Sequence, residues 1–265
     1  MRPELVKRIL TALILASLAI WWILFAPSPW FDWILGILAV AAVFELIHML
    51  CLPLRFWFSL SAIVAVVMIL VSQHAVVAIL LLGVVWTALL TIFGKDSPDT
   101  TQSDVVNHLA LAYWMAIWLL LFVWTLLLLH QLPFGNPFIL GAFVGVWISD
   151  IAAYFAGRRF GRNKLCPAIS PGKTVEGALA GIFFGTLAAA GIWILFAHVS
   201  MPLAIILGVT LTLTGILGDL AESAVKRAAH VKDSGNLLPG HGGLLDRIDA
   251  LVPAVSISGL LWIGL

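Results

Sequence analysis

The sequence predicts an all-α, polytopic integral membrane protein with about nine transmembrane helices and a cytoplasmic N-terminus. The mean hydropathy of the 265 residues is +1.11, and apolar runs long enough to cross a bilayer recur along the chain. Basic residues, in addition, follow only every second run. The expected spans are Ile9–Phe25, Phe31–Leu50, Phe56–Val71, Ala75–Phe93, Leu109–Leu129, Phe138–Ala156, Val175–Ala197, Pro202–Leu217 and Ile248–Leu265.

The first run follows Arg2, Lys7 and Arg8, as the apolar part of a cleaved signal peptide would. The run is long and no A-x-A-like cleavage site follows it, so we expect a retained helix. All 14 Lys and Arg residues lie before the first span or after spans two, four, six and eight. By the positive-inside rule these segments are cytoplasmic. The alternation also supports the span count, because one missed helix would break it.

Spans of roughly 20 residues use most of the chain, so no large soluble domain is expected. We divide the chain into an N-terminal region of about five spans and a C-terminal catalytic region of about four. The regions are residues 1–130 and 131–265, the second with cytoplasmic loops 157–174 and 219–247.

Glycines recur at four-residue spacing in the seventh span, at Gly177, Gly181 and Gly185. Small residues at this spacing let membrane helices approach closely, within one protomer or between two. We interpret this face as structural.

The segment Asp219–Asp249 contrasts with the apolar remainder of the chain. It holds nine of the 27 charged residues, five acidic and four basic, with glycines between them. Charges inside a membrane protein are costly and mark functional sites. Carboxylates beside lysines and arginines favour binding of a metal ion and a phosphate.

If the eighth span continues as a helix, four polar residues of this segment share one helical face. Asp219, Glu222, Ser223 and Lys226 stand at positions i, i+3, i+4 and i+7. They could form an ion or phosphate site. They could equally be a capped helix end with intrahelical ion pairs.

The end of the segment has a similar pattern. Asp246 and Asp249 are three residues apart, with Arg247 between them, at the expected start of the ninth span. Such carboxylates could hold Mg²⁺ while the arginine binds phosphate. The glycine-rich stretch before them could present backbone N–H groups to phosphate oxygens.

Other polar residues lie elsewhere on the same side. Asp150 falls within the sixth span and is a functional candidate for that reason. Gly172, Lys173 and Thr174 are similar to the end of a P-loop, but Pro167 stands where the first glycine belongs and no strand is expected before it, so we reject this interpretation. Glu45 and His48 are one helical turn apart. We expect a hydrogen-bonded structural pair rather than a proton or metal site.

Two long motifs resemble those of the phosphatidate cytidylyltransferases, the CDP-diacylglycerol synthases. The first comprises SAVKR at Ser223, then Lys232-Asp233, and PGHGGLLDRID ending at Asp249. The second runs from Asp150 to Gly177 and includes SPGKTVEG. The N-terminal 140 residues match only in hydropathy and span number. We expect the second motif to form the other wall of the first motif's pocket.

The resemblance implies transfer of a cytidylyl group from CTP to phosphatidate, giving CDP-diacylglycerol and pyrophosphate. The phosphate nucleophile is already ionised near neutral pH, so the site must chiefly neutralise and align two anions. The implied cofactor is Mg²⁺, with a second cation left open. The implied partners are CTP, phosphatidate from the inner leaflet, the lipid bilayer and a second copy in a homodimer, without nucleic acid. The implied location is the bacterial inner membrane, with the active site on the cytoplasmic side.

The resemblance also implies roles for individual residues. The expected metal ligands are Asp219, Asp246 and Asp249. The expected catalytic residues are Asp246, Lys226 and Arg247. The expected substrate-binding residues are Ser170, Lys173, Thr174, Ser223, Arg227, Lys232 and His241.

Two other classes of membrane protein are weaker alternatives. A transporter would place polar groups near the bilayer midplane in broken helices, whereas here they gather at one edge. An enzyme that joins CDP-lipids to alcohols would carry a D-x-x-D-G motif, which the sequence lacks.

Overall fold

The computed structural model describes residues 3–50, 55–72, 74–93, 102–235, 237 and 242–265. It is 82% helical, which confirms the predicted class of an α-helical membrane protein. The helices are α1 (Pro3–Phe25), α2 (Ser28–Met49), α3 (Arg55–Ser72), α4 (Ala75–Phe93), α5 (Gln102–Gln131), α6 (Gly135–Phe160), α7 (Val175–Phe196), α8 (Met201–Ala228), α9 (Leu245–Ile248) and α10 (Leu251–Ile263). Two short strands, β1 (Lys164–Cys166) and β2 (Ser170–Thr174), lie between α6 and α7.

Each predicted span coincides with an apolar helix. Among the described residues, five helices (α2, α5, α6, α7 and α8) are long and apolar enough to cross a membrane. Shorter apolar helices lie within α1, α3, α4 and α10. Helices of this kind satisfy all their backbone hydrogen bonds internally, as the bilayer interior requires.

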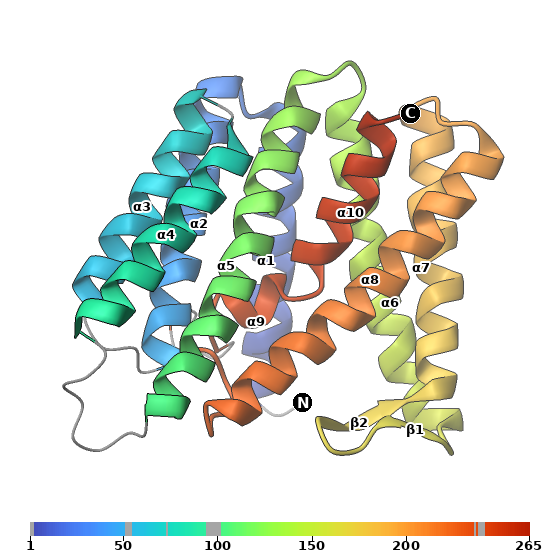
Figure 1. Cartoon of the computed structure of the whole chain (residues 1–265). Coiled ribbons are helices and arrows are strands. Elements are labelled where there is room, and N and C mark those ends of the chain that lie inside the picture. Colours follow the sequence, from blue (N-terminus) through green and yellow to red (C-terminus); the bar gives the residue numbers. More distant parts are fainter. Residues whose placement is uncertain (1–2, 51–54, 73, 94–101, 236, 238–241) are drawn as a thin grey trace.

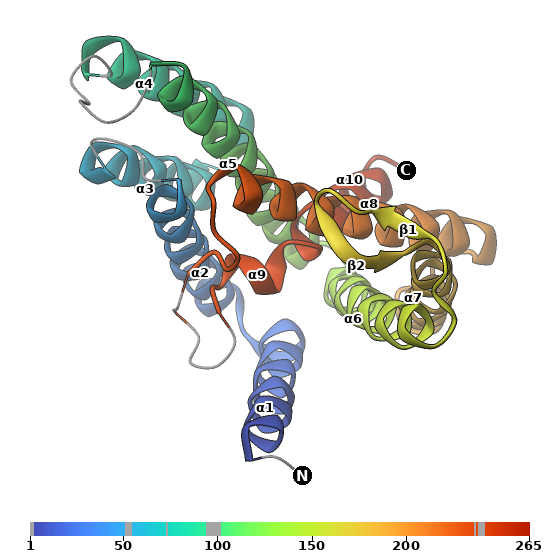
Figure 2. The same cartoon turned by 90° about the horizontal axis from the view of Figure 1, so that it is seen from below.

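The helices stand side by side, and α8 crosses the others obliquely (Figure 1). Helix α10 packs against α5, α6 and α8, so the last helix joins the two halves of the chain. Figure 2 shows α9 between α2 and α8 and the β1–β2 hairpin across the ends of α6 and α7. The hairpin, the start of α1 and the end of α8 lie at the same end of the molecule (Figure 1).

The hairpin is an exception to the all-α prediction. Its strands are antiparallel, with Lys164 opposite Thr174 and Cys166 opposite Ser170. The open end of the hairpin is held by the Glu176 carboxylate. It accepts hydrogen bonds from the Asn163 backbone N–H at 3.1 Å and from the Asn163 side-chain amide at 3.0 Å. The pairing of the two strands satisfies part of the backbone of this polar loop.

A strand therefore does precede Gly172, Lys173 and Thr174, contrary to our expectation. These residues nevertheless lie in the extended strand β2. An extended strand does not gather successive N–H groups around one phosphate as a P-loop does. The P-loop interpretation stays rejected, on backbone conformation rather than on the absence of a strand.

The ninth predicted span is also different, because it begins with the separate short helix α9. Pro253 in the first turn of α10 has no N–H to donate to the Asp249 carbonyl four residues earlier. The helical hydrogen-bond series is thus interrupted between α9 and α10. Asp249 keeps helical backbone angles, and its N–H donates to the Leu245 carbonyl at 2.9 Å, so Asp246 and Asp249 lie one helical turn apart as predicted. The prediction that this turn continues unbroken into the last span was wrong.

The glycine face of α7 packs directly on α6. A Cβ atom at Gly177 would lie 2.7 Å from the Ala153 carbonyl oxygen, and one at Gly185 would lie 2.7 Å from the Gly145 carbonyl oxygen. Contacts this short leave no room for a side chain. The structural interpretation of this face is confirmed, and the contacts are made within one protomer.

We expect Gly185→Val to lower the free energy of unfolding by about 1–3 kcal/mol, because the added methyl groups would separate α6 from α7. Gly191 in the same helix is the matched control, since a Cβ there would meet nothing within 4 Å. Thermal unfolding of the two detergent-solubilised valine variants measures the difference. Equal losses at both positions would contradict this packing argument.

Candidate active site

The predicted polar face of α8 exists, since the helix continues unbroken to Ala228. The Lys226 ammonium lies 3.4 Å from a Glu222 carboxylate oxygen and 2.6 Å from Asp246 Oδ1. The Ser223 hydroxyl donates to Asp219 Oδ1 at 3.4 Å. The intrahelical pairs that we considered as an alternative are therefore present, but Lys226 also joins α8 to α9.

Asp246 is surrounded by donors. Its Oδ2 accepts hydrogen bonds from the backbone N–H groups of Ser234 at 3.0 Å and Gly243 at 2.9 Å, while Oδ1 binds Lys226. Burial alone would raise the pKa of this carboxyl, but the Lys226 and backbone hydrogen bonds outweigh it and lower the pKa below its usual value. Asp246 is therefore an anion at neutral pH, and only 8% of its side chain is exposed.

The hairpin forms a second wall against α8. The Lys173 ammonium lies 2.5 Å from Asp219 Oδ2. The Arg227 Nε donates to the Ile169 carbonyl at 3.5 Å. The two sequence motifs therefore lie beside one another, whereas their forming the two walls of one pocket stays a prediction.

Three acidic side chains converge beside these basic groups. Asp249 interacts electrostatically with Asp219 and Glu222, and Glu222 is only 2% exposed. Apart from the ion pair with Lys226, no described N–H or O–H group donates to either oxygen of Glu222. Buried carboxylates that lack donors are costly unless a cation neutralises them.

The other predicted site residues that the structure describes lie on β2, on α9 and in the segment between α8 and α9. Thr174 is buried, and its hydroxyl accepts a hydrogen bond from the Gly177 N–H at 3.1 Å, which caps α7. Ser170 lies at the other end of β2. Arg247 and Lys232 are exposed. The remaining predicted residue, His241, lies outside the described residues.

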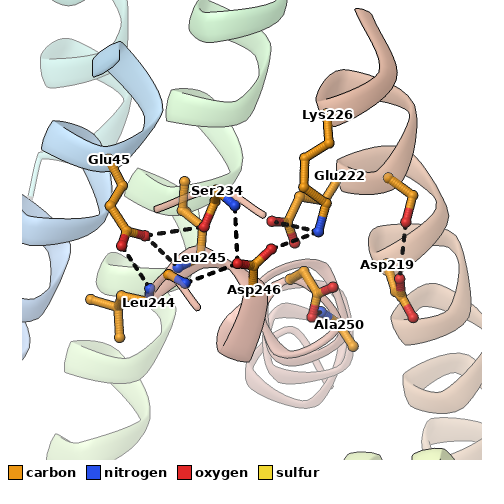
Figure 3. A network of polar contacts seen from close by, with 12 residues as sticks. Glu45, Asp219, Glu222, Lys226, Ser234, Leu244, Leu245, Asp246 and Ala250 are labelled. Atoms are coloured by element: carbon orange, nitrogen blue, oxygen red, sulfur yellow. Dashed lines mark hydrogen bonds and ion pairs between the residues drawn. The ribbon is translucent and has the colours of Figure 1, made fainter. Parts of the chain in front are cut away.

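Glu45 is the residue whose surroundings we did not anticipate. Figure 3 shows its carboxylate reaching from α2 to Ser234, Leu244 and Leu245, beside Asp246. The His48 ring nitrogen instead lies 2.8 Å from the Phe44 carbonyl oxygen. The cost of burying a carboxylate indicated that Glu45 needed a partner. Nothing in the sequence indicated a partner about 200 positions away.

An apolar cavity of about 310 Å³ adjoins the acidic residues. It lies between α5 and α8, with Trp114, Thr214 and Leu217 among its lining residues, and Glu222 and Asp249 also line it. Leu217 is 63% exposed, so the lining extends to the apolar outer surface of the helices. The cavity could hold a hydrocarbon chain beside a charged group.

Comparison with known proteins agrees with these features. The sequence profile of the cytidylyltransferase family matches residues 6–263. A phosphatidate cytidylyltransferase of Pseudomonas aeruginosa is 34% identical over 97% of this chain and 96% of its own length. One from Bacillus subtilis is 35% identical over 94% of each chain. One from Staphylococcus aureus is 45% identical over 131 residues, 49% of this chain and 50% of its own length.

Proposed function

Because this chain belongs to the cytidylyltransferase family and makes CDP-diacylglycerol from CTP and phosphatidate, we propose that its active site lies where α8, α9 and the hairpin meet. The observation that carries this proposal is the placement of Lys226 between Glu222 and Asp246. Beside this group, Lys173 of the hairpin pairs with Asp219 of α8. A dense set of charges at the meeting point of three elements suits a reaction between two polyanions.

In this proposal the basic residues bind the phosphates of the two substrates. Lys173, Lys226, Arg227 and Arg247 would offset the repulsion between phosphatidate and the α-phosphate of CTP and hold them for in-line attack. The ionised phosphatidate oxygen needs no strong general base. Ser170, Thr174, Ser223, Lys232 and His241 are the further residues that we propose for substrate binding.

We propose Mg²⁺ as the cofactor. Among the described residues, no three metal-binding side chains already stand close enough to hold an ion, but the chemistry of the donors fits, because Mg²⁺ prefers carboxylate oxygens. Asp219 and Asp249 would hold it, with the poorly satisfied Glu222 beside them. Asp246 would contribute Oδ1, which it now shares with Lys226. When bound, the ion would stabilise negative charge on the phosphates.

Purified protein should release pyrophosphate from CTP only when phosphatidate and Mg²⁺ are both present, and a chelator should stop the reaction until Mg²⁺ is restored. Full activity with a chelator would refute the metal proposal. Untouched CTP together with solute flux in liposomes would favour a transporter instead.

We further propose nine membrane spans, with the hairpin end of the molecule in the cytoplasm of a bacterial inner membrane. The alternation of basic residues supports this orientation. So does the common position of the hairpin, the start of α1 and the end of α8. The named relatives are bacterial. A homodimer, which the family resemblance suggests, belongs to the same proposal.

Phosphatidate would enter sideways between α5 and α8, with an acyl chain in the apolar cavity and its phosphate beside the charged residues. The cavity volume of about 310 Å³ and its exposed lining residue Leu217 support this route. Lateral entry spares the lipid from leaving the hydrocarbon phase, which would cost about 0.8 kcal/mol per CH₂ group.

We expect Thr214→Trp to raise the KM for phosphatidate about tenfold by filling the cavity, with the KM for CTP changed less than about twofold. Leu213→Trp is the matched control, because Leu213 is an exposed neighbour on α8 that is not among the lining residues. Steady-state kinetics in mixed micelles measure both constants. Equal effects of the two variants would argue against this entry route.

A further inference from the structure

Glu45 connects the N-terminal helices to the loop that precedes α9. The residue as a whole is only 6% exposed. Oε1 accepts a hydrogen bond from the Leu244 N–H at 2.9 Å, while Oε2 accepts one from the Leu245 N–H at 2.9 Å and one from the Ser234 hydroxyl at 3.3 Å. One buried anion of α2 thus binds three donors near the other end of the chain.

The loop backbone lies directly against this carboxylate. A Cβ atom at Gly235 would lie 2.6 Å from Glu45 Oε1, and one at Gly243 would lie 2.7 Å from Oε2. A side chain at either position would force the Glu45 carboxylate to shift. The two glycines therefore allow Glu45 to reach the N–H groups.

The same loop also holds Asp246. The backbone N–H groups of Ser234 and Gly243 donate to Asp246 Oδ2, and Figure 3 shows Ser234 between Glu45 and Asp246. Ser234 uses its hydroxyl for one carboxylate and its N–H for the other. A shift of the loop at Glu45 would thus move the groups that orient Asp246, and with them the ion pair to Lys226.

We propose that Glu45 is a positioning residue for cytidylyl transfer, which holds the loop so that Asp246 and Lys226 keep their mutual geometry. This inference rests on the proposed active site. A carboxylate suits the role because it only accepts hydrogen bonds. A glutamine would present an NH₂ group to a backbone N–H, leave one donor without an acceptor and loosen the loop.

We expect Glu45→Gln to lower kcat about 30-fold while each KM changes less than about threefold, because misplaced groups weaken the transition state more than substrate binding. Ser234→Ala should lower kcat about fivefold in the same direction, because it removes one of the three donors. The kcat of the double variant should equal that of Glu45→Gln alone, because the Ser234 hydroxyl acts through Glu45. Hydrogen exchange at residues 242–248 should be faster in both single variants.

Asp32→Asn is the control, since it makes the same chemical change at the other acidic residue of α2 and should retain activity and exchange rates. A Glu45→Gln variant with wild-type kcat would overturn the inference, as would one whose only change is a lower melting temperature. If Glu45→Gln does not fold, Ser234→Ala decides alone, and wild-type kcat in that variant overturns the inference. Asp246→Asn, assayed in parallel, tests the active site itself. Full activity of Asp246→Asn would refute the proposed site. If Asp246→Asn is inactive while Glu45→Gln keeps wild-type activity, only the role of Glu45 is refuted.

Discussion

Asp246→Asn should reduce cytidylyl transfer at least about 10³-fold, the scale of losing a preorganised charge in an active site. Both carboxylate oxygens of Asp246 are engaged, one by Lys226 and the other by two backbone N–H groups. The asparagine NH₂ group would face either the ammonium or those N–H donors. Pyrophosphate release from CTP measures the loss.

The loss should come from chemistry rather than from misfolding, because asparagine has the same shape as aspartate. The melting temperature in detergent should therefore fall by only a few degrees, the equivalent of about 1 kcal/mol. Asp32→Asn is again the control. Activity near that of the wild type in Asp246→Asn would remove Asp246 from the catalytic residues and from the proposed metal ligands.

Lys226→Met should abolish transfer and also destabilise the protein by about 3 kcal/mol, because it leaves buried carboxylates without their cation. The side chains of Glu222 and Asp246 are only 2% and 8% exposed, and Lys226 contacts both. Methionine fills a similar volume without the charge. Activity assays and thermal unfolding of the same preparation measure the two effects.

The double variant Lys226→Met/Asp246→Asn separates these effects. Removing one of the two facing carboxylates should recover part of the stability while the enzyme stays inactive. Double and single variants of equal stability would show that the Lys226–Asp246 pair is not the source of the loss.

The helices were predictable from the sequence because the bilayer imposes a local rule. Any segment that crosses it must be apolar over roughly 20 residues, so hydropathy alone located the apolar helices, including α8 up to its polar face. The hairpin was not predictable in this way, because strands of three and five residues carry little periodicity. The break before α10 was missed because hydropathy does not register the missing backbone N–H of Pro253.

Within the site, too, contacts along one helix were predictable and contacts between separate elements were not. The contact between Lys226 and Glu222 followed from their spacing on one helix. The pairing of Lys226 with Asp246 and of Lys173 with Asp219 depends on how separate elements pack. Glu45 is the extreme case, because its donors lie about 200 positions away.

The sequence by itself therefore determined the class of protein, the extent of its apolar helices and the family to which its two motifs point. All of these depend on hydropathy, helical spacing or motif identity, which are local properties of the chain. Only the tertiary structure decided which carboxylate meets which lysine, and that α2 supports the loop beside Asp246. Such contacts between distant residues depend on helix packing, where close approach at glycines and the cost of unpaired buried charge select one arrangement.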